Sequence, residues 1–218
     1  MPQSRRPLYV RHFVACGLVP DCTSTLKIIG PEEQKTAFAR FPPPGVISSK
    51  IANMPTKAPT KAEFRLACGQ FATGVTVVTA ERAPGRAHGM TANSVTSVSL
   101  EPLLLLICVD QRAHLLPMVK KQGRFGVSVL RENQVAISRY FAQTEENLDM
   151  EAKLGIRYRW TPSGIPLLED ALVHITCNVA ASYVAGDHTI FIGEVESTKV
   201  FDGESLLFFR GAYRRILP

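Results

Sequence analysis

The chain has 218 residues, of which 45% are hydrophobic and 20% are charged, and its formal net charge is +6. This composition is typical of a globular protein with one sizeable core, and it excludes a collagen-like fibre, a membrane bundle and a wholly disordered chain. Residues 1–60 contain eight Lys or Arg against three acidic residues, which leaves 17 against 16 in the rest, so we expect no nucleic-acid-binding surface there.

Residues 1–59 are predicted to be a poorly ordered, basic leader ahead of one folded domain at residues 60–218. Nine of the fifteen prolines lie in this leader, and it has no sustained helical or alternating pattern. Two alternatives stay open. The Arg-bearing, acid-poor start is compatible with an organelle transit peptide, and Met54 is a candidate for the true start of the protein. In each case we expect the leader to play no part in the chemistry.

The five cysteines are an odd set with no C-x-x-C pair and no matching His spacing. The sequence therefore supports neither a metal site of the zinc type nor a disulfide framework. Cys108 and Cys177 lie in apolar runs, where we expect reduced core residues. Reduced cysteines predict a reducing compartment, most simply the cytoplasm.

The folded part is predicted to begin with a short helix. Thr60 and Glu63 have the spacing of a capping box, and residues 73–74 are expected to end the helix. Residues 74–80 are rich in β-branched side chains and predict a strand, and turn residues separate this strand from a second extended piece at residues 87–91.

The next apolar run, LLLLICV at residues 103–109, is too short to cross a bilayer, so we expect a fully buried strand and no membrane association. Residues 124–130 alternate cleanly between apolar and small side chains and predict another strand. Helices are expected at residues 133–142 and 144–154.

Two long strands are predicted at residues 173–183 and 188–200, joined by a turn, and residues 206–209 close the pattern. Six or seven strands with few helices favour an antiparallel barrel or sandwich over a parallel sheet with crossover helices.

The segment GMTANSVTSVS at residues 89–99 is the most informative one for function, because motifs for a Rossmann site, a P-loop, a zinc protease and a nucleophile elbow are all missing from the sequence. Small hydroxyl and amide side chains here lie between two apolar strands. Such groups hydrogen-bond the polar edges of a ring, and neutral donors arranged in a nest also hold a phosphate. The alternative is an ordinary Ser/Thr-rich loop.

Two further polar groups are candidate site elements. Residues 110–113 (DQRA) directly follow the apolar run, and Arg112 among them is either a phosphate clamp or an exposed surface arginine. The tetrad GDHT at residues 186–189 lies at the turn between the two longest strands. His188 there is either a pH-sensitive donor or simply solvated. The histidines interpreted as structural are His88, His114 and His174.

Five separated segments carry a resemblance to a known family. They are FRLACGQFATGVTVVT from Phe64, GMTANSVTSVSLEPLLLLICVD from Gly89, GRFGVSVL from Gly123, GDHTIFIGEV from Gly186, and the tail LLFFRGAYRRI. In this order they resemble the flavin reductase-like family, the small NAD(P)H-dependent reductases that serve two-component monooxygenases. The resemblance implies a mainly β fold with flanking helices, namely a six-stranded antiparallel split barrel of the FMN-binding type. It also implies a homodimer.

The resemblance further implies which residues form the site. The residues implied to bind the flavin ring and ribityl chain are Ala92, Asn93, Ser94, Val95 and Thr96, with Ser99 near the flavin or the nicotinamide. Those implied to lie toward the flavin phosphate are Asp110, Gln111, Arg112 and Ala113. The tetrad Gly186, Asp187, His188 and Thr189 is the implied nicotinamide side, and His188 is the expected catalytic residue.

The implied activity is hydride transfer from NADH or NADPH to FMN or FAD, with the reduced flavin passed to a separate monooxygenase. Such chemistry belongs to the cofactors, so the protein mainly positions two rings and tunes the charge around them. Two alternatives are a non-catalytic flavin-binding protein and a flavin oxidase of the pyridoxamine-phosphate oxidase type. The GDHT tetrad argues against the first, and the nearly neutral body of the chain argues against the second.

Overall fold

A computed structural model describes residues 58–143, 145 and 147–216, so the predicted leader lies outside the described residues except for its last two. The helices are α2 (Lys61–Cys68), α3 (Leu115–Gln122), α4 (Val135–Phe141) and α5 (Leu148–Lys153). The first six strands are β1 (Thr73–Gly74), β2 (Thr76–Ala83), β3 (Arg86–Ala92), β4 (Val95–Leu100), β5 (Leu103–Asp110) and β6 (Arg124–Val129). The others are β7 (Tyr158–Trp160), β8 (Pro166–Leu168), β9 (Val173–Ala185), β10 (His188–Val200), β11 (Leu207–Phe209) and β12 (Ala212–Arg214).

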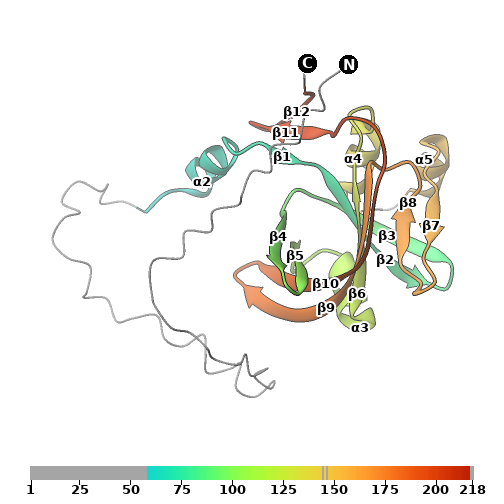
Figure 1. Cartoon of the computed structure of the whole chain (residues 1–218). Helices are drawn as coiled ribbons and strands as arrows, with labels where there is room; N and C mark the ends of the chain where they lie inside the picture. Colours follow the sequence, from blue (N-terminus) through green and yellow to red (C-terminus); the bar gives the residue numbers. More distant parts are fainter. Residues whose placement is uncertain (1–57, 144, 146, 217–218) are drawn as a thin grey trace, which may run out of the picture. The chain divides into compact units, whose positions relative to one another are not determined.

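The main sheet has the strand order β3-β2-β6-β9-β10-β5-β4, and every neighbouring pair in it is antiparallel. Its two edge strands, β3 and β4, follow each other in the chain, so the sheet curls without closing between them (Figure 1). This confirms the predicted mainly β, antiparallel split barrel with flanking helices. The main sheet has seven strands, one more than the six-stranded barrel that the resemblance implies, because residues 95–100 form β4 where we predicted a polar segment between strands.

Two smaller sheets flank the barrel. β1, β11 and β12 form one of them, next to α2, and β7 with β8 forms the other, next to α5 (Figure 1). Among the described residues, no helix is long and apolar enough to cross a membrane.

The main core lies inside the curled sheet and is closed by α3. Phe125, Ile107, Val109 and Phe191 are at most 1% exposed there, and α3 contributes Leu115 and two further buried residues. We did not predict α3. Its Pro117 is tolerated because proline in the first turn removes no helical hydrogen bond, and Gly123, with a φ of 65°, caps the other end. Packing of α3 against the core fixes the loop that precedes it, residues 110–114.

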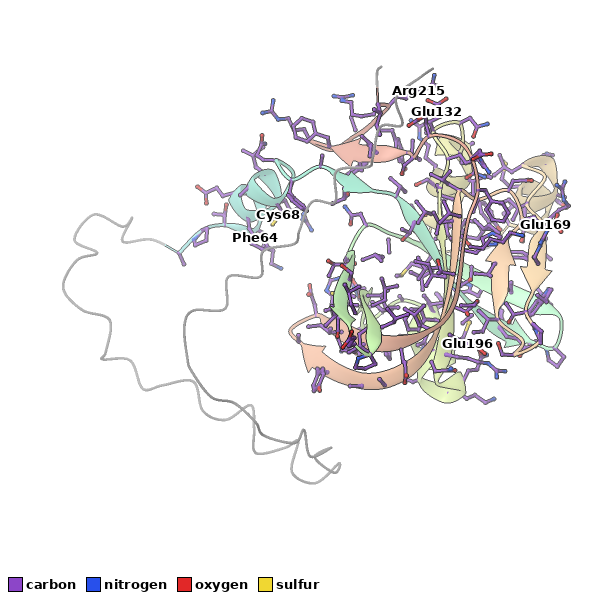
Figure 2. The ribbon with its side chains drawn as sticks, in the orientation of Figure 1. Phe64, Cys68, Glu132, Glu169, Glu196 and Arg215 are labelled. Carbon is purple, nitrogen blue, oxygen red and sulfur yellow. The ribbon has the colours of Figure 1, made fainter. Side chains whose placement is uncertain are left out.

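The capping box predicted for the first helix is confirmed. The Glu63 backbone N–H donates to Thr60 Oγ1 over 3.2 Å, and the Thr60 N–H donates to Glu63 Oε2 over 2.7 Å. The helix ends at Cys68, earlier than predicted, and none of its residues is buried. Figure 2 labels Phe64 and Cys68 on this helix, which stands apart from the main sheet. Its apolar residues are therefore exposed in the single chain.

The strand at 103–109 is not fully buried, which corrects our prediction. Along β5 the side chains alternate, with Leu105, Ile107 and Val109 in the core, whereas Leu103 is 49% exposed. A continuous apolar run predicts two covered faces, but only one face of β5 meets the core. Cys177 is fully buried as predicted, and burial raises the pKa of its thiol to about 12, whereas Cys108 is only half-buried.

His174 is structural, as predicted, and it makes stability depend on pH. The residue is 5% exposed, and its Nε2 donates to the Leu168 carbonyl over 2.6 Å. Burial lowers the pKa of His174, and the nearby charges of Arg159 and Lys199 act in the same direction. Below the ordinary histidine pKa of about 6.5, the unfolded chain therefore takes up a proton that the folded chain resists.

We expect the free energy of unfolding to fall as the pH drops below about 6.5, with this one group contributing at most about 1.4 kcal/mol per pH unit. His174→Gln keeps a donor toward Leu168 but cannot titrate, so urea unfolding between pH 5 and pH 8 should show a flatter dependence in this variant. An unchanged slope would show that His174 takes up its proton equally in both states.

Candidate functional site

The candidate site lies where the main sheet stays open. Asn93 and Ser94 join the two edge strands, β3 and β4. The Ser94 hydroxyl donates to the Cys108 carbonyl over 3.2 Å, and the Cys108 N–H donates to the Ser94 carbonyl over 3.2 Å. The connection is thus hydrogen-bonded to β5 at Cys108, two residues before Asp110, where the polar loop begins.

The hydroxyl-rich segment at residues 89–99 does not present all its side chains to one surface. The Thr91 hydroxyl donates to the Ser138 carbonyl of α4 over 2.7 Å, and Ser99 accepts a hydrogen bond from the Glu101 N–H over 3.1 Å. Both hydroxyls therefore fasten local structure. Among the predicted flavin residues, Ala92 is buried and Val95 packs against the core, whereas Asn93, Ser94 and Thr96 are exposed.

Strand pairing brings together the two polar groups that lie far apart in the sequence. β5 and β10 pair so that Asp110 is opposite His188 and Val109 is opposite Thr189. The DQRA loop and the GDHT turn are therefore neighbours at one rim of the barrel. The turn itself is a two-residue connection in which Gly186 has a φ of 62°, a value that favours glycine.

Within the turn, His188 and Asp187 form a close pair. His188 Nδ1 lies 2.7 Å from Asp187 Oδ1, and the side chains are 42% and 84% exposed. The hydrogen bond with His188 lowers the pKa of the Asp187 carboxyl. A carboxylate can only accept, so Nδ1 carries the proton, and Nε2 is the ring nitrogen left for another partner.

Arg112 is the candidate phosphate clamp, and its guanidinium is hydrogen-bonded to the Asp110 carboxylate. Its Nε and Nη2 lie 3.1 Å and 2.9 Å from the two Asp110 oxygens, and its backbone N–H donates to Oδ1 over 2.8 Å. These hydrogen bonds hold the pKa of Asp110 far below its usual range. The Arg112 side chain is 87% exposed and keeps its remaining N–H donors for a ligand, although a neighbouring carboxylate offsets its charge.

A cavity of about 560 Å³ lies between β3, the DQRA loop and the end of α4. This volume is in the range of small-molecule and cofactor sites. Asp110, Arg112 and Ala113 line it, together with residues 88–91, His114 and residues 141–143. The side chains of Gln111 and of the GDHT turn are not among its lining residues. Asn93 lines a different cavity of about 450 Å³, beside the end of α2 and Phe208.

His88 and His114 are site-lining residues that the sequence reasoning missed. Their ring centroids are 6.2 Å apart, and both border the 560 Å³ cavity. No local signal could have found them, because β3 and the loop before α3 become neighbours only through the sheet. Phe141, at the end of α4, and Gln143, just after it, also line the cavity, and no local pattern predicted this.

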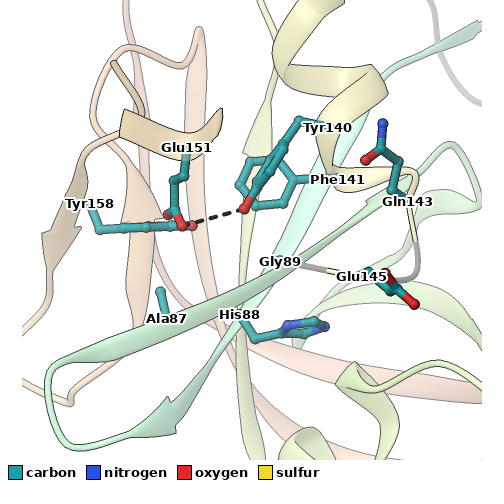
Figure 3. A pocket seen from close by; sticks show the side chains of 9 residues that line it. All are labelled: Ala87, His88, Gly89, Tyr140, Phe141, Gln143, Glu145, Glu151 and Tyr158. Atoms are coloured by element: carbon teal, nitrogen blue, oxygen red, sulfur yellow. Dashed lines mark hydrogen bonds between the residues drawn. The ribbon is translucent and has the colours of Figure 1, made fainter. Parts of the chain in front are cut away.

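A second, much smaller cavity, which shares His88, Gly89, Phe141 and Gln143 with the first, has no room for a ligand. It measures about 10 Å³, and Tyr140, Glu151 and Tyr158 crowd it (Figure 3). The Tyr140 hydroxyl donates to Glu151 Oε2 over 3.4 Å and joins α4 to α5. This contact supports the end of α4 that borders the larger cavity.

The chain is similar to known proteins over its described part. The profile of the family described as "Flavin reductase like domain" matches residues 68–217. An NADH-dependent flavin reductase of a Rhodococcus species is 41% identical over 159 residues, which cover 72% of this chain and 87% of the relative. The reductase component of the 4-hydroxyphenylacetate 3-monooxygenase of Thermus thermophilus is 38% identical and is covered to 97%, with 72% of this chain.

Solved structures give the same result. The NADH:FAD oxidoreductase of Streptomyces globisporus, in complex with NAD and FAD fragments, superposes with a TM-score of 0.66 at 39% sequence identity. The match covers 72% of this chain and 93% of the other.

Proposed function

The chain belongs to the flavin reductase-like family, and from this premise we propose that the DQRA loop binds the flavin phosphate while the GDHT turn binds the nicotinamide. The protein is an NAD(P)H-dependent flavin oxidoreductase that supplies reduced flavin. The observation that supports this residue assignment is the pairing of Asp110 with His188, which brings the DQRA loop and the GDHT turn side by side. The chemistry also requires the two reacting rings to be close. Ser94, which we propose faces the flavin ring, is hydrogen-bonded to Cys108, two residues before Asp110.

The residues present fit a flavin. The 560 Å³ cavity offers a guanidinium, two imidazoles and an aromatic ring, a mixture of apolar surface and few polar groups that is typical of cofactor sites. Arg112 and the backbone of the DQRA loop would hold the phosphate. The Asn93–Ser94 connection does not line this cavity, and we propose that it contacts the ring and ribityl chain from outside it. When both cofactors are bound, the reduced nicotinamide supplies a hydride and the flavin accepts it.

The chain's own residues prepare the site for this transfer. Asp187 holds the His188 ring by Nδ1, so Nε2 is presented in a fixed direction. We propose that Nε2 contacts the nicotinamide and stabilises the charge that changes there. Thr189 is only 1% exposed, so its side chain supports the turn from the protein interior and is not available to contact the nicotinamide. The core-packed Val95 likewise supports the edge of the sheet.

The function is tested by crossing NADH and NADPH with FMN, FAD and riboflavin in anaerobic assays of the purified protein. We expect the nicotinamide to be oxidised and the flavin to be bleached in equal amounts. Flavin binding without bleaching would instead support a non-catalytic flavin carrier.

The partner proposed for the reduced flavin is a separate monooxygenase. Relatives from Thermus thermophilus and Rhodococcus opacus are named as reductase components of monooxygenases. Addition of a flavin-dependent monooxygenase from the same source should couple nicotinamide oxidation to oxygenation of its substrate, even when a dialysis membrane separates the two proteins. If oxygenation requires direct contact between the two proteins, the reduced flavin is not delivered by free diffusion.

We also propose that two copies associate. In the single chain, Phe64, Leu66 and Phe71 are 64%, 69% and 77% exposed on and after α2, and Leu100 on the edge strand β4 is 79% exposed. Large exposed apolar surfaces of this kind mark interaction sites. Light scattering should give the mass of a dimer, and a monomer at micromolar concentration would contradict the proposal.

The division into a leader at residues 1–59 and a domain from residue 60 is likewise a proposal, as is a reducing, cytoplasmic location. The first is supported by the capping box at Thr60, where the helical structure of the domain begins. A chain begun at Met54 should unfold at the same temperature and reduce flavin at the same rate as the full chain. A loss of either property would give the leader a role.

Arg112 and Asp110 should act on FMN in opposite directions. Arg112→Ala removes the clamp, and we expect FMN binding to weaken about 3- to 5-fold, whereas Asp110→Asn frees the guanidinium and should tighten it by a similar factor. Riboflavin lacks the phosphate, so its dissociation constant should change less than about 2-fold in both variants. Quenching of flavin fluorescence measures both constants. Lys199→Ala controls for the loss of one positive charge, and an equal effect on FMN and riboflavin would contradict the assignment.

A further inference from the structure

The side chain of Gln111 points to the GDHT turn, although the residue lies in the DQRA loop. Its Nε2 donates to Thr189 Oγ1 over 3.0 Å and to the His188 carbonyl over 3.3 Å. Its backbone N–H donates to the Asp187 carbonyl over 2.9 Å. One residue therefore makes three hydrogen bonds to three consecutive residues of the turn.

The chemistry of these partners fixes how the amide is oriented. A carbonyl oxygen can only accept, so the NH₂ group of Gln111 faces the His188 carbonyl and not the reverse. Thr189 is 1% exposed, so water cannot readily replace the hydrogen bond that its hydroxyl accepts from Gln111. Gln111 itself is exposed and is not among the residues that line the 560 Å³ cavity.

We infer that Gln111 is a positioning residue that fixes the turn carrying His188, and that it is not a ligand of the flavin phosphate. Its two charged neighbours in the loop, Asp110 and Arg112, both line the cavity, whereas Gln111 does not. Gln111 thereby couples the loop proposed to hold one cofactor to the turn proposed to hold the other. This inference rests on the proposed function of His188, and it extends that function to how the imidazole is held.

Strand pairing holds the end of the turn, where His188 lies opposite Ala185 and Asp110, but the side chains of the turn itself are exposed. His188 and Asp187 are 42% and 84% exposed in their side chains, and Gly186 has no heavy atom near the position of a Cβ. A short exposed turn at the end of two long strands opens readily, because few buried contacts resist it. The three bonds from Gln111 limit the range of directions in which Nε2 of His188 points.

The chain offers a matched control for these hydrogen bonds of Gln111. Gln122 on α3 also spans two elements: its Nε2 donates to the Glu81 carbonyl, and its Oε1 accepts from the Glu81 N–H. It fastens the β2–β3 hairpin, away from the DQRA loop and the GDHT turn. Gln122→Ala therefore removes two side-chain hydrogen bonds of a glutamine without changing the proposed site.

The first test uses the cofactor-free protein and needs no activity. In Gln111→Ala, and in the isosteric Gln111→Glu, which has no N–H donor to offer, amide hydrogen exchange at residues 185–190 should be about 10-fold faster, as expected for the loss of two side-chain hydrogen bonds. Exchange at residues 81–86 should be unchanged. Gln122→Ala should give the reverse pattern. Equal exchange of the turn in wild type and Gln111→Ala would overturn the inference.

The second test separates positioning from phosphate binding. With saturating flavin, we expect Gln111→Ala to slow anaerobic flavin reduction by NADH about 10-fold, while the ratio of the dissociation constants of FMN and riboflavin stays within about 2-fold of wild type. In a His188→Ala background, the same change should slow reduction by less than about 2-fold, because the residue acts through His188. A selective loss of FMN affinity, or a full effect without His188, would overturn the inference.

These outcomes are distinguishable from failure of the proposed function. If the wild-type protein does not reduce flavin at all, the proposed function fails, and the exchange experiment still reports whether Gln111 holds the turn. If the wild type reduces flavin and Gln111→Ala does so equally fast, only the inference fails.

Discussion

Replacing Gly193 with alanine is expected to lower the free energy of unfolding by about 3 kcal/mol, at the upper end of the usual cost of overpacking a core. A Cβ at this position of β10 would lie 2.6 Å from Phe125 Cζ and 2.7 Å from Cys177 Cβ. Both neighbours are fully buried, so neither can move aside into open space. The loss is a large part of the roughly 5–15 kcal/mol that holds such a domain together. Urea unfolding followed by tryptophan fluorescence or circular dichroism measures it.

A second glycine supplies the control. Gly74 in β1 also lies in a strand with no positive φ, but the nearest atom to its Cβ position is Ser205 Oγ at 3.8 Å. Gly74→Ala should therefore stay within about 0.5 kcal/mol of wild type. Phe125→Leu should recover part of the stability lost in Gly193→Ala, because the two positions are in contact. An effect at Gly193 no larger than that at Gly74 would show that the Phe125 ring has room to move.

The contrast between local and long-range signals explains what the sequence could predict. The capping box at Thr60 and Glu63 uses residues three apart, and the strands at 124–130 and 173–183 follow from alternation along one segment. The burial of only one face of β5, and the close contact of Gly193 with the Phe125 ring, both depend on the order of the strands in the sheet. No local pattern carries that information.

The site shows the same limit. Sequence reasoning singled out both the DQRA loop and the GDHT turn, and the family resemblance implied that Gln111 lies toward the flavin phosphate with the rest of its loop. Only the β5–β10 register reveals that its amide reaches Thr189. Likewise, Asp110 forms an ion pair with Arg112 and partly neutralises the positive charge available to a ligand. The sequence does not predict this pairing, because it depends on the conformation of the loop.

The largest effect on activity is expected for His188→Ala. Loss of one hydrogen bond to a charged group costs roughly 1.5–3 kcal/mol, so kcat/KM for the nicotinamide should fall about 10- to 100-fold. The flavin dissociation constant should change less than about 2-fold, because the DQRA loop and the cavity beside it are left intact. Stopped-flow reduction of flavin-saturated protein with NADH, and with NADH deuterated at C4, separates hydride transfer from product release.

Asp187→Asn refines this expectation. Asparagine keeps an acceptor for Nδ1 but removes the negative charge that the histidine faces at 2.7 Å. If Asp187 chiefly orients the ring, the variant should lose less than His188→Ala, about 3- to 10-fold, a loss in the range of a single neutral hydrogen bond. Glu194→Ala, an exposed change on the same strand, controls for effects on β10 itself. Wild-type reduction rates in both His188→Ala and Asp187→Asn would mean that the backbone of the turn, and not its side chains, holds the nicotinamide.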